Sequence, residues 1–200
     1  MTEQESFLVP SDLYFKAGAH IGTKFKTKYM KQFIYKSRPD GLSVLNLQLI
    51  DKRIRVAACM LSKYSTEDIL VVCRRENGWE PAKLFGKATG ARVIAGRYPP
   101  GILTNRQLSK FIEAKILIVT DPIPDRNTVN DAVNIGIPII GLCDTNNESN
   151  FLELVIPCNN KGRRSLGLVF FLLAREYLRN RGLLKPDEEL PIKVEEFMGD

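Results

Sequence analysis

Residues 16–38 form a run of cations whose chemistry suits phosphate binding. Seven Lys or Arg residues and no Asp or Glu occur in this stretch. Lysine and arginine neutralise phosphates and release condensed counterions, so an acid-free run favours a polyanion such as RNA. Aromatic residues alternate with the cations and could stack on unpaired bases. The candidate contacts are Lys24, Lys26, Lys28, Lys31 and Arg38.

This run has a second interpretation, a solvated loop whose aromatic side chains anchor it to the core. For Phe25 and Phe33 we favour anchoring to the core. For the lysines we favour RNA, because no acid nearby offers them a partner.

A second candidate is residues 158–165, directly ahead of a long predicted helix. The unpaired N–H groups and positive dipole of a helix start attract anions. A free phosphorylated metabolite could bind there, but three cations in four residues suit a larger polyanion better. The candidate contacts are Asn159, Asn160, Lys161, Arg163 and Arg164.

Residues 97–105 read as a rigid loop, because two prolines fix their φ angles and Gly101 permits a turn. Such a loop could present Arg97, Asn105 and Arg106 to RNA at a low entropic cost. Bracing of the fold is an equally good interpretation of the segment.

Asp121 and Asp144 are the residues that most resemble those of an enzyme, since each follows a predicted parallel strand. A nucleotide- or sugar-phosphate-handling enzyme could use them. The alternative, which we favour, is that both carboxylates cap turns and helix starts, because Asp competes for local backbone donors.

Motifs for cofactor binding and catalysis are missing. No G-x-G-x-x-G follows the first predicted strand, and no G-x-x-x-x-G-K-[ST] occurs. His20 is the single histidine, and no G-x-S-x-G elbow accompanies it. A zinc site would have to combine His20 with scattered cysteines, against the usual ligand spacing. We therefore assign no catalytic residue, no metal, no cofactor and no small-molecule substrate.

Composition places the chain among intracellular proteins. The 200 residues carry a net charge of +6, which favours a polyanionic partner. The four cysteines form no C-x-x-C pair, and three lie in or beside apolar runs, as expected of a reducing, cytoplasmic compartment. The acidic start argues against a signal peptide, and the longest apolar run is about half of what a membrane helix needs.

The candidate residues lie between strands and helices that alternate along the chain. The patterns predict strands at 33–35, 42–45, 69–73, 92–95, 115–120, 137–143 and 154–156. They predict helices from residue 12, at 46–63, 82–89, 126–135 and 165–181, the last closed by Gly182. Such alternation is typical of an α/β fold with a doubly wound, mainly parallel sheet between two helical layers.

Five stretches are similar to one family of ribosomal proteins. They are Ala17-Gly-Ala-His-Ile-Gly-Thr23, Gly96-Arg-Tyr-Pro-Pro-Gly-Ile-Leu-Thr-Asn105, Ile118-Val-Thr-Asp-Pro122, Ile156-Pro-Cys-Asn-Asn-Lys-Gly162 and Leu172-Leu-Ala-Arg-Glu-Tyr-Leu-Arg-Asn-Arg-Gly182. In this order they resemble the S-two family of small-subunit ribosomal proteins, whose eukaryotic member is also called protein SA or laminin-receptor precursor. The resemblance runs from about residue 8 to residue 183.

Departures from the family pattern favour its archaeal branch. Bacterial members carry a coiled-coil hairpin where only about ten residues follow Asn105 here, and eukaryotic members add a long C-terminal extension. The missing extension also argues against a cell-surface receptor role. Relatives often show Arg-Ala-Asp-His where Ile123, Pro124, Asp125 and Arg126 stand, so contacts of that loop could differ.

The resemblance implies a three-layer α/β fold with a five-stranded parallel sheet and a structural, non-catalytic protein of the small ribosomal subunit. It implies small-subunit rRNA and other small-subunit proteins as partners, with a role in subunit assembly and translation. We expect a single rRNA-binding domain over residues 8–183. A short N-terminal arm at 1–7 and a weakly ordered acidic tail at 184–200 should flank it.

Overall fold

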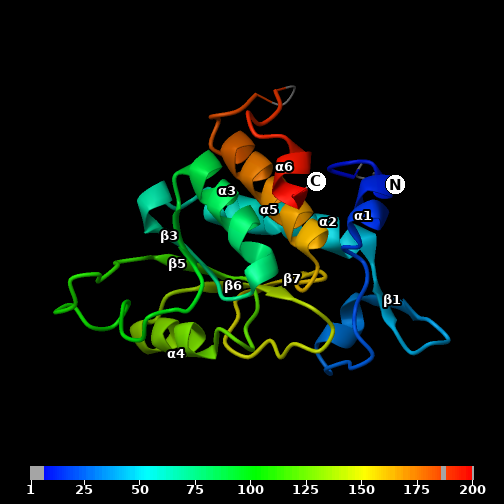
Figure 1. Ribbon diagram of the computed structural model, residues 1–200, viewed down its shortest axis with the longest axis horizontal. Coiled ribbons are helices and arrows are strands. Elements are labelled where there is room, and N and C mark those ends of the chain that lie inside the picture. Colours follow the sequence, from blue (N-terminus) through cyan, green and yellow to red (C-terminus); the bar gives the residue numbers. More distant parts are fainter. Residues whose placement is uncertain (1–6, 186–187, 200) are drawn as a thin grey trace.

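The apolar run of residues 69–73 forms the middle of the main sheet. All five residues of this strand, β3 (Ile69–Cys73), are buried, so both of its faces are covered. In the computed structural model, which describes residues 7–185 and 188–199, β3 belongs to a five-stranded sheet of order β4-β3-β5-β6-β7. Every pairing in that sheet is parallel. The three-layer, doubly wound α/β architecture expected from the sequence is therefore confirmed (Figure 1).

The remaining elements follow the predicted alternation. The other strands are β1 (Ile34–Ser37), β2 (Ser43–Leu45), β4 (Arg92–Ala95), β5 (Ile116–Val119), β6 (Ile139–Cys143) and β7 (Leu154–Pro157). The α-helices are α1 (Ser11–Ala17), α2 (Leu47–Leu61), α3 (Trp79–Thr89), α4 (Arg126–Ile135), α5 (Arg163–Asn180) and α6 (Val194–Met198). Short 3₁₀ turns precede β1, β3 and α3.

The two faces of the sheet are covered unequally. Residues at alternate strand positions, such as Ile69 and Val71, join the larger apolar cluster with α2, α3 and α5. Leu70 and Val72 point to the other face, which α4 and the loop of residues 96–115 cover. Figure 1 shows α4 on one side of the sheet and α2, α3 and α5 on the other. The loop therefore replaces the helix that would usually connect β4 to β5.

The C-terminal segment contains a helix that the sequence patterns did not predict. Within residues 188–199, α6 packs against α5. Phe197 is buried and meets Phe171 edge to face, with 5.6 Å between ring centres. A Cβ at Gly167 would collide with the backbone of Phe197, so α5 needs a glycine at this contact. Most of the expected N-terminal arm, residues 1–6, lies outside the described residues, as do 186, 187 and 200.

Candidate nucleic-acid interface

The basic run lies on a projecting arm beside the main sheet. β1 and β2 pair antiparallel, and Ile21 bridges to Val44 as a third, short partner. Backbone hydrogen bonds from Gly22 to Ser43 and from Ser43 to Thr23 continue this pairing. The arm, residues 20–45, extends from the side opposite to the 96–115 loop (Figure 1).

The cations of the arm are exposed, and most have no acid beside them. Within residues 7–185 and 188–199, no ion pair is found for Lys24, Lys28 or Lys31. Lys26 donates from Nζ to Ser37 Oγ. Arg38 is different, because its guanidinium lies 3.1 Å from the Asp40 carboxylate, a partner that the sequence interpretation overlooked. Most of the arm's positive charge is therefore available to an outside anion.

The aromatic side chains of the arm divide into two groups. Phe33 is only 2% exposed and packs in the core, as predicted. The same prediction for Phe25 is wrong, because 80% of its surface is exposed. Tyr35 is also exposed, to 70%. Phe25 and Tyr35 thus stand in solvent among lysines, and Tyr29 is 41% exposed. Exposed rings of this kind can stack on unpaired bases.

Threonines connect the arm to the loop that follows β6. The hydroxyls of Thr23 and Thr145 are 2.9 Å apart, and the backbone N–H of Thr23 also donates to Thr145 Oγ1 at 2.9 Å. Thr27 donates its backbone N–H to Thr145 O and its hydroxyl to Asn147 O. A Cβ at Gly22 would collide with Thr145, so the two segments are in close contact. The carboxyl edge of the sheet therefore holds the base of the arm.

Asn147 and Asn160 form the centre of a buried polar network at this edge. Asn147 donates from Nδ2 to Asp121 Oδ1 at 2.8 Å and accepts from the Asp144 N–H at 2.8 Å. Asn160 donates from Nδ2 to Leu142 O and to Asn147 Oδ1. Asn160 is fully buried, and its amide joins the ends of β6 and β7.

Lys161 and Asn159 also belong to this internal network. Lys161 donates from Nζ to Asp144 Oδ2 and to Asn146 Oδ1, both at 3.0 Å. Asn159 accepts the backbone N–H groups of Lys161 and Gly162 at Oδ1. The sequence interpretation treated Lys161 as an unpaired cation, whereas the fold supplies it with a buried acid. Both side chains hold the loop together.

The two enzyme-like carboxylates are committed to structural partners. Asp121 accepts the N–H of Ile123 at 3.1 Å and forms an ion pair with Arg75. Asp144 accepts the N–H of Thr145 at 2.6 Å, besides pairing with Lys161. Each carboxylate therefore caps a local turn, which confirms the interpretation that the sequence favoured.

Arg163 and Arg164 lie at the start of α5 rather than ahead of it. The helix begins at Arg163, two residues before the predicted start, so both arginines occupy its first turn. Both are exposed, and α5 has no acid in that turn. Positive side chains at a helix N-terminus oppose its dipole, and a bound anion relieves that cost. A Cβ at Gly199 would collide with the Arg163 guanidinium, which thus packs beside the end of α6.

The third set of candidates is spread along the 96–115 loop. Asp131 of α4 accepts hydrogen bonds from the Tyr98 hydroxyl and the Gly101 N–H, both at 3.0 Å. These bonds and buried apolar side chains of the loop show that it braces the fold. Arg97, Asn105 and Arg106 are exposed, although the Asn105 side chain accepts the N–H of Gln107. The structure therefore does not bring all predicted contacts into one site.

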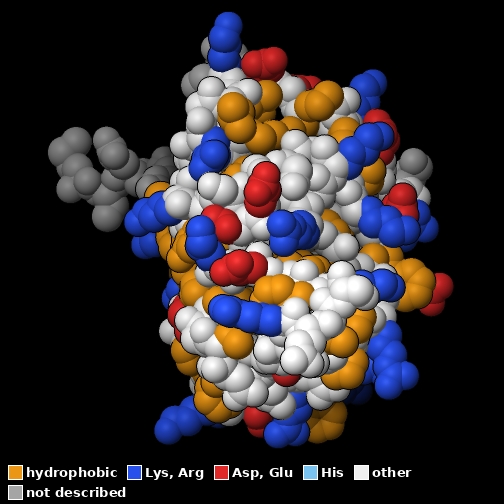
Figure 2. All heavy atoms as spheres, turned by 90° about the vertical axis from the view of Figure 1, so that its left-hand side faces the viewer, with side chains coloured by type: hydrophobic (Ala, Val, Ile, Leu, Met, Phe, Trp, Pro, Cys, Tyr) orange, Lys and Arg blue, Asp and Glu red, His pale blue; other side chains and the backbone are white. Residues whose placement is uncertain are grey.

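The side of the molecule opposite to the arm carries acidic as well as basic side chains. The side that carries the 96–115 loop shows Lys and Arg side chains mixed with Asp and Glu (Figure 2). An intermingled surface attracts a polyanion less than a uniformly basic one. The arm is therefore the better candidate surface.

The part of the chain that the structure describes contains neither a cluster of metal ligands nor a helix that could span a membrane. No three His, Cys, Asp or Glu side chains gather there as a metal would require. No helix in that part is both long and apolar enough to span a bilayer. Cys73, Cys143 and Cys158 are buried, as predicted for small apolar side chains, and Cys59 is exposed.

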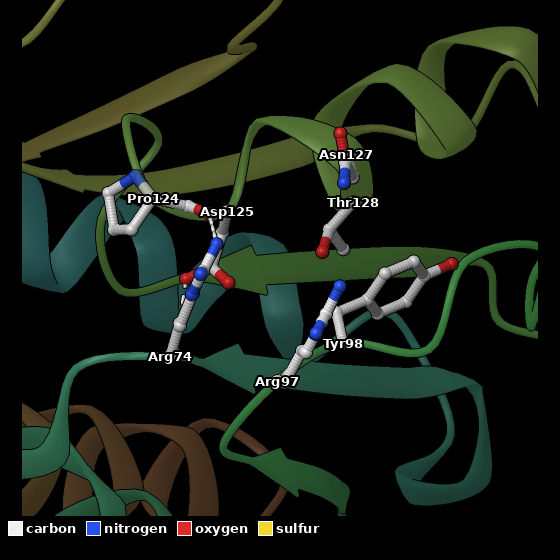
Figure 3. Close-up of a pocket in the computed structure, with 7 residues that line it drawn as sticks. All are labelled: Arg74, Arg97, Tyr98, Pro124, Asp125, Asn127 and Thr128. Atoms are coloured by element: carbon white, nitrogen blue, oxygen red, sulfur yellow. Dashed lines mark hydrogen bonds between the residues drawn. The ribbon is translucent and has the colours of Figure 1, made fainter.

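Sequence reasoning missed one further polar site. Arg74 follows β3, and Arg97 follows β4. Both line a pocket together with Asp125 and Thr128 of the segment after β5 (Figure 3). The position of Arg74 directly after a buried strand was the available signal, since parallel sheets bind ligands at their carboxyl edge.

Comparisons with known proteins agree with this arrangement. A family model described as Ribosomal protein S2 matches residues 112–179. The chain is 50% identical to small ribosomal subunit protein uS2 of Nanoarchaeum equitans over 95% of its own length and 94% of that protein. It is 46% identical to the Methanococcus maripaludis protein of the same name, covering 97% of this chain and 87% of that one.

A third protein named small ribosomal subunit protein uS2, from Thermoplasma acidophilum, is 45% identical, with 96% of this chain and 97% of the relative covered. Matches at this identity over nearly full length confirm the resemblance found in the sequence, including its archaeal type. The matched family consists of structural ribosomal proteins rather than enzymes. This chain belongs to the ribosomal protein S2 family.

Proposed function

We propose that the chain is a structural, non-catalytic constituent of the small ribosomal subunit that binds small-subunit rRNA through its basic arm. The observation that carries this proposal is the set of exposed lysines at residues 24–31, interleaved with the exposed ring of Phe25. Lysines supply affinity for the phosphate backbone, and an exposed ring supplies a stacking platform. The names of the relatives support the ribosomal setting.

The polar network at the carboxyl edge has a supporting role in this proposal. Thr145 and Asn147 hold the base of the arm, and Lys161 neutralises the buried Asp144 beneath them. A fixed arm loses little conformational entropy when it binds, so rigid attachment favours affinity. Arg163 and Arg164 at the start of α5, and Arg97, Asn105 and Arg106 on the 96–115 loop, would add contacts to RNA.

We further propose neighbouring small-subunit proteins as partners, a role in subunit assembly and translation, and a cytoplasmic location. The relatives' names support a place in the small subunit, and such a place brings protein neighbours with it. No membrane and no small-molecule substrate form part of this proposal.

Sedimentation of the native protein tests the function. The chain should co-sediment with small ribosomal subunits from its own cells at physiological salt. Recovery of the whole population at the top of the gradient would contradict the proposal.

A salt titration tests the surface. Lys24, Lys28 and Lys31 are replaced together by Gln, and binding to small-subunit rRNA is measured at several salt concentrations. The slope of log K against log salt should become shallower by about 0.7–0.9 for each lost phosphate contact. The matched control replaces Lys63, Lys83 and Lys87, which are exposed on or beside α2 and α3, and should keep the slope. Equal slopes for both triple variants would remove the arm from the interface.

A further inference from the structure

A small pocket opens where the doubly wound sheet changes direction. The chain runs from β3 outward to β4 and then crosses back to β5 on the other side of β3, so the sheet changes direction at β3. The segments that follow these three strands surround the pocket. Figure 3 shows Arg74, Arg97, Asp125 and Thr128 around it, whereas the Tyr98 ring points away. Open α/β sheets bind ligands at this position, outside the carboxyl ends of the strands.

The floor of the pocket carries polar atoms that lack partners. Asp125 is 2% exposed, and its Oδ2 accepts the backbone N–H of Arg74 at 3.2 Å. Its other oxygen, Oδ1, is buried without a hydrogen-bond partner, and so is the hydroxyl of the fully buried Thr128. Buried polar atoms are almost always satisfied in folded proteins. Within the residues that the structure describes, the protein itself supplies no donor for Asp125 Oδ1, so a donor from outside the chain could bind there.

The rim of the pocket determines the charge of that ligand. Arg74 and Arg97 are exposed at its mouth, and Arg74 is held in place by a 3.0 Å bond from Nη1 to Pro124 O. Two guanidinium groups repel a cationic side chain that would otherwise pair with the carboxylate. They favour a neutral donor that has negative charge close by. A ribose 2′-hydroxyl between two phosphates has both properties.

We propose that this pocket binds one ribose of an RNA strand, with the 2′-hydroxyl donating to Asp125 Oδ1 and adjacent phosphates on Arg74 and Arg97. The inference rests on the proposed RNA-binding function and deepens it, because this contact would distinguish RNA from DNA. The Thr128 hydroxyl completes the site as a second partner for the 2′-oxygen. The small size of the pocket suits a single hydroxyl rather than a base.

The position of the pocket supports RNA over other occupants. The pocket lies at the carboxyl ends of β4, β3 and β5, and the polar network that holds the arm lies at the carboxyl ends of β5, β6 and β7. Asp121, at the end of β5, accepts from Asn147 of that network. Pocket and arm therefore lie toward opposite ends of one edge of the sheet, and a strand that contacts both would run along that edge.

Mapping of 2′-deoxy interference tests the proposal. Small-subunit rRNA is transcribed with a low fraction of 2′-deoxynucleotides, bound to the full chain, and the positions depleted from the bound fraction are mapped. Wild-type protein should show depletion of about tenfold at one or a few positions, the effect of losing a hydrogen bond to a charged group. Asp125→Ala should abolish depletion there, and Thr128→Val, which preserves side-chain shape, should reduce it.

The control and the contrary outcomes are distinct. Asp68 lies directly before β3, at the opposite edge of the sheet from the pocket, and pairs with Lys115. The control variant Asp68→Ala should keep the wild-type pattern of 2′-deoxy interference. If Asp125→Ala and Thr128→Val both keep the wild-type interference pattern, the inference is wrong. If Asp125→Ala does not fold, an unchanged pattern in Thr128→Val is enough to overturn it. Reduced incorporation of Asp125→Ala into small subunits with unchanged interference would also overturn it and indicate a donor from a protein. If wild-type protein binds no rRNA, the proposed function fails as well.

Discussion

The ammonium of Lys161 lies 3.0 Å from the carboxylate of Asp144, which is 1% exposed. This pair joins the loop after β7 to the loop after β6, and through Thr145 it reaches the base of the arm. A lysine that reads in sequence as a free phosphate-binding cation is therefore a structural counterion.

Replacing Lys161 should lower stability more than it changes RNA affinity. Lys161→Met leaves the Asp144 carboxylate buried without its counterion, which should lower the free energy of unfolding by about 1–3 kcal/mol. This is less than for a fully buried pair, because the Lys161 side chain is 37% exposed. Urea denaturation gives the stability change. The salt slope of rRNA binding should stay within error of wild type, and a clear flattening would assign Lys161 to the interface instead.

The exposed rings of the arm should matter for RNA binding and not for folding. Phe25→Ala and Tyr35→Ala should each weaken rRNA binding by about 1–3 kcal/mol, the range for one base stacked on an aromatic ring. Because both rings stand in solvent, the melting temperature should hardly change. Fluorescence anisotropy measures binding. Phe151→Ala, at another exposed ring, is the control, and an equal loss of affinity in all three variants would argue against stacking by the arm.

Asp125 should make stability depend on pH. Burial raises the pKa of its carboxyl to about 6, and the nearby Asp121 charge also raises it, while the N–H of Arg74 and the guanidinium groups of Arg74 and Arg75 lower it. The usual value is about 3.9. Between these values the folded state keeps a proton that the unfolded state releases, so the free energy of unfolding falls as pH rises through this window. Above it, the cost of the buried charge remains.

The isosteric variant Asp125→Asn removes this titration. The difference in the free energy of unfolding between the variant and wild type should shift in favour of the variant by about 1–3 kcal/mol from pH 4 to pH 7.5. This range follows from the size of the pKa shift. Urea denaturation of both proteins at the two pH values cancels the contribution of every other group. The same difference at both pH values would show that the pKa of Asp125 is close to its ordinary value.

The C-terminal helix should contribute measurably to stability. Phe197→Ala removes a ring that is 1% exposed and packed against Phe171, so the free energy of unfolding should fall by about 3 kcal/mol. Gly167→Leu should displace α6 through its collision with the Phe197 backbone. Limited proteolysis should then cleave after α5 in both variants but not in wild type. Resistance equal to wild type in both would contradict the docking of α6.

The amino-acid sequence alone determined the layers of the fold and the order of its elements. Runs such as Ile69–Cys73 are apolar at every position, and a parallel strand covered on both faces requires this. Helix ends were less certain, since the start of α5 was placed two residues late, and α6 was missed because its five residues give too short a periodic pattern. The basic run was visible because charge composition is a local property.

The tertiary structure alone decided which of these side chains face an outside partner. Lys161 and Asp144 are 17 residues apart, and Thr23 meets Thr145 across 122 residues, so no local pattern could reveal these pairs. The exposure of Phe25 and the burial of Asn160 likewise depend on how distant loops meet at one edge of the sheet. Burial is a property of packed surfaces, whereas the sequence records only the tendency of each residue to be buried.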